Sequence, residues 1–159
     1  MSTLYKIIVS LFVVFFIGCS NASLVKSEQK LEQNGAVSLF QLKNYTDTPR
    51  AGMRSANIIE GILLAKGFVV KSHISQNAVS FSEAQKIAKR DGSASFIIGG
   101  VSEWRYKTGI DGEPAVSLQL AMYNTQSGAI EWSATAANSD WGTDSIGTTA
   151  QKLIQMMME

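Results

Sequence analysis

The chain has 159 residues, of which 17% are charged and 45% are hydrophobic, so length and composition indicate one folded domain rather than a disordered chain. It carries 14 basic and 13 acidic residues, and Lys6 is the only charged residue before Gly18, so the rest of the chain is neutral. A neutral chain lacks the basic surface expected of a nucleic-acid-binding protein, and it argues against a polybasic membrane patch.

Residues 1–18 are expected to be a lipoprotein signal peptide. The apolar run 7–18 is shorter than the roughly 20 residues that a spanning helix needs, and it suits the hydrophobic region of a secretory signal. Cys19, the only cysteine, follows it directly, as in the lipobox of bacterial lipoproteins, where the cysteine carries the lipid. A plain signal peptide with a chance cysteine is the alternative. By analogy with bacterial sorting rules, Ser20 in place of aspartate favours the outer membrane.

The next segment, 19–34, is polar and is expected to be a tether between the lipid and a domain of residues 35–159. The first expected strand covers 36–42. Thr48 and Pro49 then suit the N-cap and first position of a helix.

That helix is expected to end at Gly67, and the next strand covers 68–74. A capping box that begins at Ser82 predicts a second helix, which ends near Asp91. Three strands follow, at 95–107, 115–124 and 129–138, and a last helix covers 143–158. The order is therefore β-α-β-α-β-β-β-α, which predicts a single α/β domain: a mixed sheet with an antiparallel C-terminal meander and helices packed on it.

The stretch EWRYKTGIDGEP, residues 103–114, carries more chemistry than a simple connection needs. Alternation along the strand places Trp104 and Tyr106 on one face and Arg105 on the other. Two glycines permit unusual backbone angles and a proline stiffens the exit, so the loop is expected to project from one end of the sheet as a shaped tip. Arg105 is interpreted as a loop support or a contact to a neighbouring subunit, with a plain surface charge as the alternative.

Asp111 and Glu113 are the carboxylates of this tip, and ordinary turn chemistry with a solvated glutamate is the alternative reading. Two carboxylates hydrolyse a glycosidic bond only at a suitable separation and when burial raises the pKa of one of them. The sequence also lacks a nucleophile elbow, a phosphate-binding loop and zinc-ligand spacing. We therefore expect no enzymatic activity, no cofactor and no metal site.

Four phrases, YTDTPRAG, EWRYKTGIDGEPAVSLQL, SGAIEWSATAA and SDWG, together resemble the PelC family, the outer-membrane lipoproteins of the Pel exopolysaccharide secretion system. The broader fold is similar to that of the curli secretion lipoprotein and of lipoproteins that activate peptidoglycan synthases. The resemblance implies a lipid-anchored, dodecamer-like homo-oligomeric ring on the periplasmic face of the outer membrane. Such a ring guides the cationic Pel polysaccharide to the export barrel protein PelB.

The resemblance also assigns residues. Asp111 matches the aspartate that lines an electronegative pore mouth, with Glu113 as a weaker companion, and repetition around a ring turns this modest charge into an acidic collar. Trp141 matches a residue directed toward the inner leaflet of the outer membrane, and packing back on the sheet is its alternative. Trp104 and Tyr106, like Arg105, are expected to support the loop or a subunit contact.

The remaining candidates have structural interpretations. His73, the only histidine, is expected on a strand surface rather than in a metal site. Trp132 is expected in the core, and Met156–Met158 in the core or a subunit interface. A lipoprotein regulator that binds and activates a cell-envelope enzyme, such as a peptidoglycan synthase, is the alternative function. A subunit of a protein-secretion machine is a further one.

Overall fold

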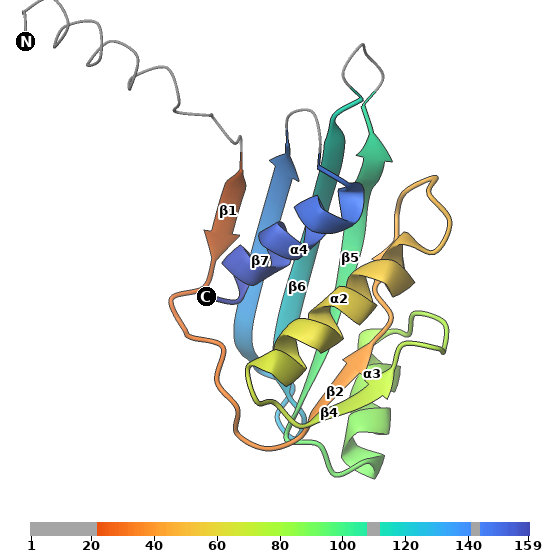
Figure 1. Ribbon diagram of the computed structural model, residues 1–159. Coiled ribbons are helices and arrows are strands. Elements are labelled where there is room, and N and C mark those ends of the chain that lie inside the picture. Colours follow the sequence, from red (N-terminus) through yellow and green to blue (C-terminus); the bar gives the residue numbers. More distant parts are fainter. Residues whose placement is uncertain (1–21, 108–111, 141–143) are drawn as a thin grey trace, which may run out of the picture.

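A seven-stranded mixed sheet forms the centre of the structure (Figure 1). The computed structural model describes residues 22–107, 112–140 and 144–159. The strands are β1 (Ser23–Lys26), β2 (Val37–Phe40), β3 (Lys43–Asn44), β4 (Val70–His73), β5 (Ser95–Tyr106), β6 (Pro114–Asn124) and β7 (Ile130–Ser139). The helices are α2 (Ala51–Ala65), α3 (Phe81–Arg90) and α4 (Ile146–Met157). The strands lie in the order β1-β7-β6-β5-β2-β4, and β3 pairs with β5.

This arrangement confirms the predicted α/β fold and adds two short strands, β1 and β3. The strands that helices separate are parallel: β2 lies between β4 and β5 and pairs in parallel with both. The last three strands form the expected antiparallel meander, with β6 in its middle. Short connections permit antiparallel pairing, whereas the parallel strands need the crossovers that α2 and α3 provide.

The main core lies between the sheet and the helices α2 and α4, which cross one face of it (Figure 1). Alternate residues of β6 point into this core, among them Val116, Leu118 and Met122, each at most 2% exposed. Trp132 of β7 is buried there as predicted. A smaller apolar cluster, Phe40, Ala84, Ala88 and Phe96, lies under α3 on the opposite face. Since α3 contacts β5 and β2, it covers only part of that face.

The starts of two helices differ from the prediction. Helix α2 begins at Ala51 and its N-cap is Arg50, with a φ of 60° and no capping side chain. Thr48 lies two residues before the N-cap, and its hydroxyl instead donates to the carbonyl of Trp104. Helix α3 begins two residues earlier than expected, where the Ser80 hydroxyl accepts a hydrogen bond from the backbone N–H of Glu83. A serine three residues before Glu83 has the reach for this bond, and Ser82 does not.

Part of the segment 19–34, expected to be a tether, belongs to the sheet. Residues 23–26 form β1, which pairs antiparallel with the edge of β7 from Ser23 opposite Ala137 to Lys26 opposite Ala134. Leu24 packs against the main core, while Val25 on the opposite face is 72% exposed. The sheet therefore begins well before residue 35.

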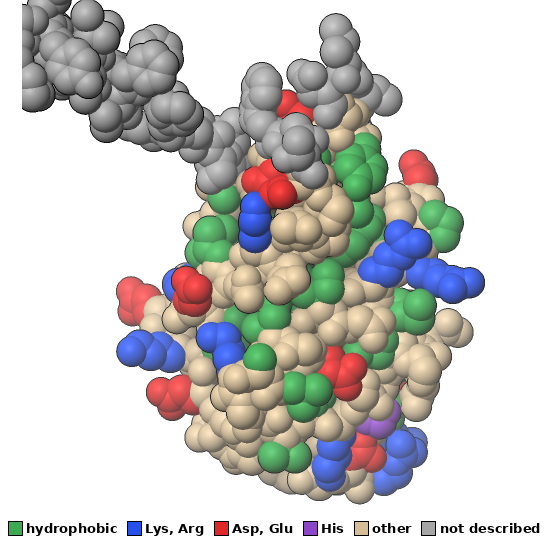
Figure 2. Space-filling view, in the orientation of Figure 1, with side chains coloured by type: hydrophobic (Ala, Val, Ile, Leu, Met, Phe, Trp, Pro, Cys, Tyr) green, Lys and Arg blue, Asp and Glu red, His purple; other side chains and the backbone are tan. Residues whose placement is uncertain are grey.

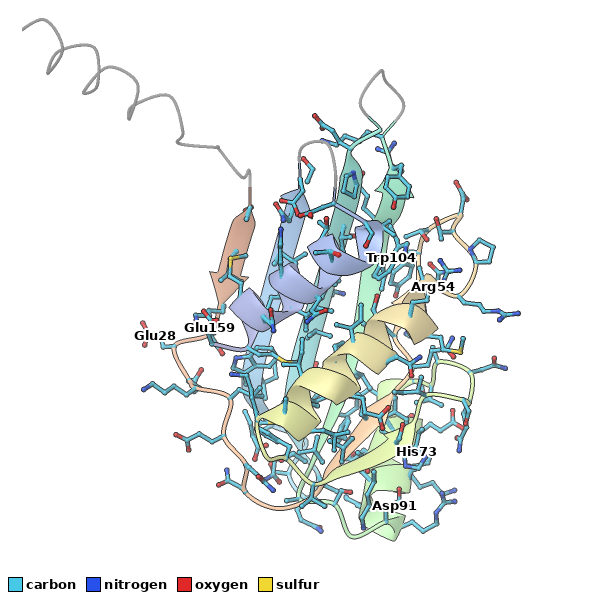
Figure 3. All side chains as sticks on the ribbon, in the orientation of Figure 1. Glu28, Arg54, His73, Asp91, Trp104 and Glu159 are labelled. Atoms are coloured by element: carbon cyan, nitrogen blue, oxygen red, sulfur yellow. The ribbon has the colours of Figure 1, made fainter. Side chains whose placement is uncertain are left out.

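His73 lies on β4, where its ring stacks on Phe40 with centroids 4.9 Å apart and its Nε2 lies 2.6 Å from a carboxylate oxygen of Asp91 (Figure 3). The contact joins the end of β4 to the end of α3. At the C-terminus, Met157 and Met158 are buried in the core and Met156 is half-buried. None of the described helices is both long enough and apolar enough to cross a membrane.

Candidate functional site

The candidate site is the end of the sheet where β5 and β7 finish and β6 begins. Tyr106 is opposite Pro114 in the β5–β6 pair, and Ala115 is opposite Ser139 in the β6–β7 pair. The backbone N–H of Asp140 donates to the carbonyl of Pro114 over 3.2 Å. The residues that flank 108–111 and 141–143 therefore lie at one end of the sheet, where β5 and β7 end on either side of β6. Asp111 and Trp141 themselves lie outside the described residues.

Glu113 closes the base of the β5–β6 connection together with Lys107. The backbone N–H of Lys107 donates to the Glu113 carbonyl over 2.7 Å, and the Lys107 Nζ lies 3.6 Å from the Glu113 carboxylate. The same ammonium donates to the Ser139 hydroxyl over 3.0 Å, which links β5 to β7. The Glu113 carboxylate is thus half-buried and paired with a cation, which reduces its share of any acidic field.

Trp104 and Tyr106 point to the helix side of the sheet. Trp104 is 3% exposed and lies in the main core, near the start of α2 (Figure 3). Its buried indole N–H has no hydrogen-bond partner among the described residues. Tyr106 is half exposed, and its hydroxyl accepts a hydrogen bond of 3.1 Å from the backbone N–H of Ile146, the first residue of α4. This bond ties the strand end that carries the loop to the helix.

Arg105 lies on the opposite face and pairs with Glu103, two residues earlier, with 2.9 Å between its guanidinium and the carboxylate. A β-bulge between Val101 and Glu103 shifts the register of β5 and β6 just before this pair. Bulges re-aim the side chains that follow them, and this one precedes the turn of Trp104 into the core. Both members of the pair are solvent-accessible, so the interaction contributes little stability within one chain.

The start of α4 completes the site. The Ser145 hydroxyl caps the helix by accepting from the Thr148 N–H, and the Thr149 hydroxyl donates to Asp140 over 2.9 Å. Lys152 pairs with Asp144 and lies 3.9 Å from Asp140. The hydrogen bond that Lys152 donates to the Asp144 carboxylate raises the pKa of this lysine above its ordinary value, so it is charged at neutral pH. Glu113, Asp140 and Asp144 therefore each have a lysine nearby.

Figure 2 shows the same mixture over the face seen there: acidic and basic side chains are interspersed and form no large patch of one sign. Among the described residues there is also no group of three or more His, Cys, Asp or Glu side chains suited to a metal ion. The long-range pairs that frame the site, such as Tyr106 with Ile146, carry no signal in the sequence, because each joins residues far apart in the chain.

The N-terminal part of the chain reaches the same end. Because β1 runs antiparallel to β7, Ser23 at its start is opposite Ala137, close to the end of β7. Cys19 lies outside the described residues. Only four residue steps separate Cys19 from Ser23, a reach of at most about 14 Å.

A scan against protein-family models and a search of curated proteins find no match. Solved structures place the domain in a class of α/β folds found in bacterial lipoproteins. Lipoprotein GNA1162 from Neisseria meningitidis matches with a TM-score of 0.57 and 16% identity, covering 77% of this chain and 94% of that one. The LpoB C-terminal domain from Escherichia coli matches with a TM-score of 0.51 and 15% identity, covering 85% of this chain and 95% of that one. At these identities the likeness is one of fold alone.

A crystal structure of the PelC dodecamer from Paraburkholderia phytofirmans is similar in sequence as well. It matches with a TM-score of 0.75 and 29% identity, covering 86% of this chain and 94% of that one. The resemblance to PelC that the sequence predicts is therefore confirmed.

Proposed function

We propose that the protein is an outer-membrane lipoprotein that forms a homo-oligomeric ring and guides a cationic exopolysaccharide through the periplasm toward its export barrel. The observation that carries this proposal is the similarity to the PelC dodecamer, at 29% identity over 86% of the chain. GNA1162 and LpoB support no function here, since they share only the fold. The role is one of binding and guiding, without catalysis.

The short segment between Cys19 and the start of β1 at Ser23 supports a fixed position of the domain close to the membrane. If Cys19 is acylated, β1 leaves at most about 14 Å of chain between the lipid and the sheet. A tether that remained free up to residue 34 would span roughly 50 Å. A regulator that reaches an enzyme across the cell wall needs the longer tether, so the geometry favours the ring over the peptidoglycan synthase activator.

The same geometry gives the candidate site an orientation. The lead from Cys19 enters at the sheet end from which the segments of Asp111 and Trp141 leave. An anchored domain would turn this end toward the bilayer. Trp141 then contacts the inner leaflet, where an indole suits the boundary between water and lipid.

Asp111 is the residue proposed to face the polymer. The pairing of Glu113 with Lys107 leaves Glu113 a weaker contributor to an acidic field, in keeping with its place as a companion. One carboxylate per subunit attracts a cation weakly, and a closed circle of identical loops multiplies the field without binding the polymer tightly at any one point. Weak binding at many sites suits a polymer that must keep moving.

The test replaces Asp111 with Lys in cells and measures secreted polymer. Because Asp111→Lys reverses the charge of every loop in the ring, we expect secretion to fall several-fold at normal protein levels. The matched control is Glu28→Lys, the same charge change at an exposed carboxylate far from the sheet end (Figure 3), which should leave secretion unchanged. Normal secretion by Asp111→Lys, with normal protein abundance, would show that the loop has no such role.

A further inference from the structure

The face of the sheet opposite α2 and α4 is only partly covered. Helix α3 packs over β5 and β2, and none of the described helices packs on the neighbouring surface of β6 and β7 on this face. Tyr45, Phe81 and Ile130 are exposed on this face, at 65%, 39% and 60% of their surface. Large apolar side chains that gather on one exposed face mark a binding surface.

Two hollows lie end to end on this face. The first, here called the aromatic trough, has a volume of about 360 Å³ and runs from Phe81 and Tyr123 to Tyr45. The second, here called the polar trough, has a volume of about 400 Å³ and runs from Tyr45 past Asp47, Ser102 and Glu103 to Arg105. Tyr45 lines both, so together they form one path that leads toward the base of the β5–β6 connection. From Tyr123 to Ser117 the path follows β6 for about 20 Å.

The aromatic rings of the path are held in place. The Tyr123 ring stacks on buried Phe96 at 5.4 Å and meets the edge of Phe81 at 5.0 Å. The Tyr45 ring rests on Gly100, so closely that a Cβ at position 100 would lie 2.7 Å from the Tyr45 Cε2. Glycine therefore creates the space that this exposed ring occupies.

Polar side chains lie beside the rings. Gln119 of β6 and Ser133 and Thr135 of β7 line the aromatic trough. Within the described residues, no hydrogen bond engages these three side chains or the Tyr45 hydroxyl, so they are available to a ligand. Lys43 is the charged residue among the described lining of the aromatic trough, whereas the polar trough holds the carboxylates of Asp47 and Glu103 beside Arg105.

We propose that this path binds a chain of pyranose sugars. A sugar ring presents C–H groups, which carry partial positive charge, to the negative face of an aromatic ring. Its hydroxyl and acetamido groups can reach the amide and hydroxyl side chains beside the rings, as in other sites with few, well-placed polar groups. Neutral sugars suit the aromatic trough. An amine-bearing sugar suits Asp47 of the polar trough, because Glu103 there already pairs with Arg105, so charge complementarity fits a polymer that contains both kinds of sugar. Sugar binding by this path is independent of the proposed export function; the identity of the polymer that it binds in the cell rests on that function.

The test measures sugar binding by calorimetry on the full chain, in a detergent without a sugar headgroup, with a hexamer of N-acetylglucosamine as the probe. We expect saturable binding, weakened about ten-fold by Tyr45→Ala, because one aromatic contact is lost. Tyr45→Phe keeps the ring and loses only the hydroxyl, so it should bind more tightly than Tyr45→Ala. Leu64→Ala, a substitution at an exposed apolar residue of α2 on the other side of the sheet, should leave binding unchanged.

Three results would overturn the proposal: no saturable binding by the wild type, equal binding by Tyr45→Ala, or an equal loss in Leu64→Ala. The mass of each variant in the same detergent is measured in parallel. If Tyr45→Ala breaks an oligomer into single chains, a second copy of the chain occupies this face and the sugar path is wrong. Failure here would leave the export role standing, because the secretion assay on Asp111→Lys tests that role separately.

Discussion

Trp141 belongs to a segment whose two flanks are fixed in the structure. Before it, Asp140 donates from its backbone to Pro114 and accepts from Thr149, and after it Ser145 caps α4. Both flanks therefore lie at the sheet end that faces the bilayer in the proposed orientation. An indole placed there would transfer its apolar surface from water to the lipid interface.

We expect Trp141→Ala to weaken the association of the unlipidated domain with phospholipid vesicles, measured by co-sedimentation. Leu64→Ala removes exposed apolar surface from α2, at a place not proposed to contact lipid, and should change nothing. Vesicle association that is the same in Trp141→Ala and the wild type would remove the membrane contact from the proposal.

At the residue scale, sequence periodicity predicts which face of an element a side chain lies on, but it does not predict contacts between elements. The burial of Trp132 and Met157 and the shared face of Trp104 and Tyr106 follow from position within one element. The ion pair of Glu113 with Lys107 does not follow from such a position, because the two side chains meet only when β5 and β6 have paired. Patterns of period two or 3.6 report which side chains share a face, and they say nothing of contacts between distant elements.

At the level of elements, local signals predict the long strands and the three described helices: alternation in β6 and β7, helical spacing of apolar residues in α2 and a capping box in α3. The strands β2 and β4 have only four residues each, but they lie in apolar runs that predict them. The strands β1 and β3, with four and two residues, lie in stretches without such a run. β1 also lies in a polar stretch, so its pairing with β7 depends on the edge that β7 offers rather than on its own composition. The polar composition of 19–34 predicts a tether throughout, and it gives no local signal for the strand at 23–26.

The docking of β1 can be tested through Leu24. Leu24 is half-buried against the main core, and Val25 beside it is 72% exposed. We expect Leu24→Ala to lower the free energy of local opening of β1 by about 1 kcal/mol, through lost burial of apolar surface. Hydrogen exchange of the amides of residues 23–26 measures this opening directly.

Val25→Ala is the matched control, because it removes a similar side chain from the solvent side of the same strand and should leave the exchange almost unchanged. The amides of β5 and β6 report on global unfolding in both variants. If Leu24→Ala exchanges in β1 at the wild-type rate, or if Val25→Ala opens the strand equally, β1 is not held by its core-facing side chain.

The whole molecule brings together segments that are far apart in the sequence. The lead from Cys19, the connection that carries Asp111 and the segment of Trp141 all join the sheet at one end. The predicted order of elements contains the two loops at this end, because β5 and β7 run in the same direction. It does not predict that the segment after Cys19 joins the sheet at this end as well, because that depends on the antiparallel direction of β1. If Cys19 carries a lipid as proposed, this four-residue strand shortens the segment between the lipid and the sheet and fixes the direction in which it enters.

This orientation predicts that an insertion before β1 reduces secretion more than the same insertion after β1. Ten Gly and Ser residues between Ala22 and Ser23 would add about 17 Å of flexible chain between the lipid and the sheet. The loop end would no longer be held near the bilayer, and we expect secreted polymer to fall. The same insertion between Glu28 and Gln29 lies after β1, where the strand already holds the domain, and secretion should stay near the wild-type level. Equal secretion by the two variants, at equal abundance, would contradict the proposed role of β1, because a free tether from 19 to 34 makes the two insertions equivalent.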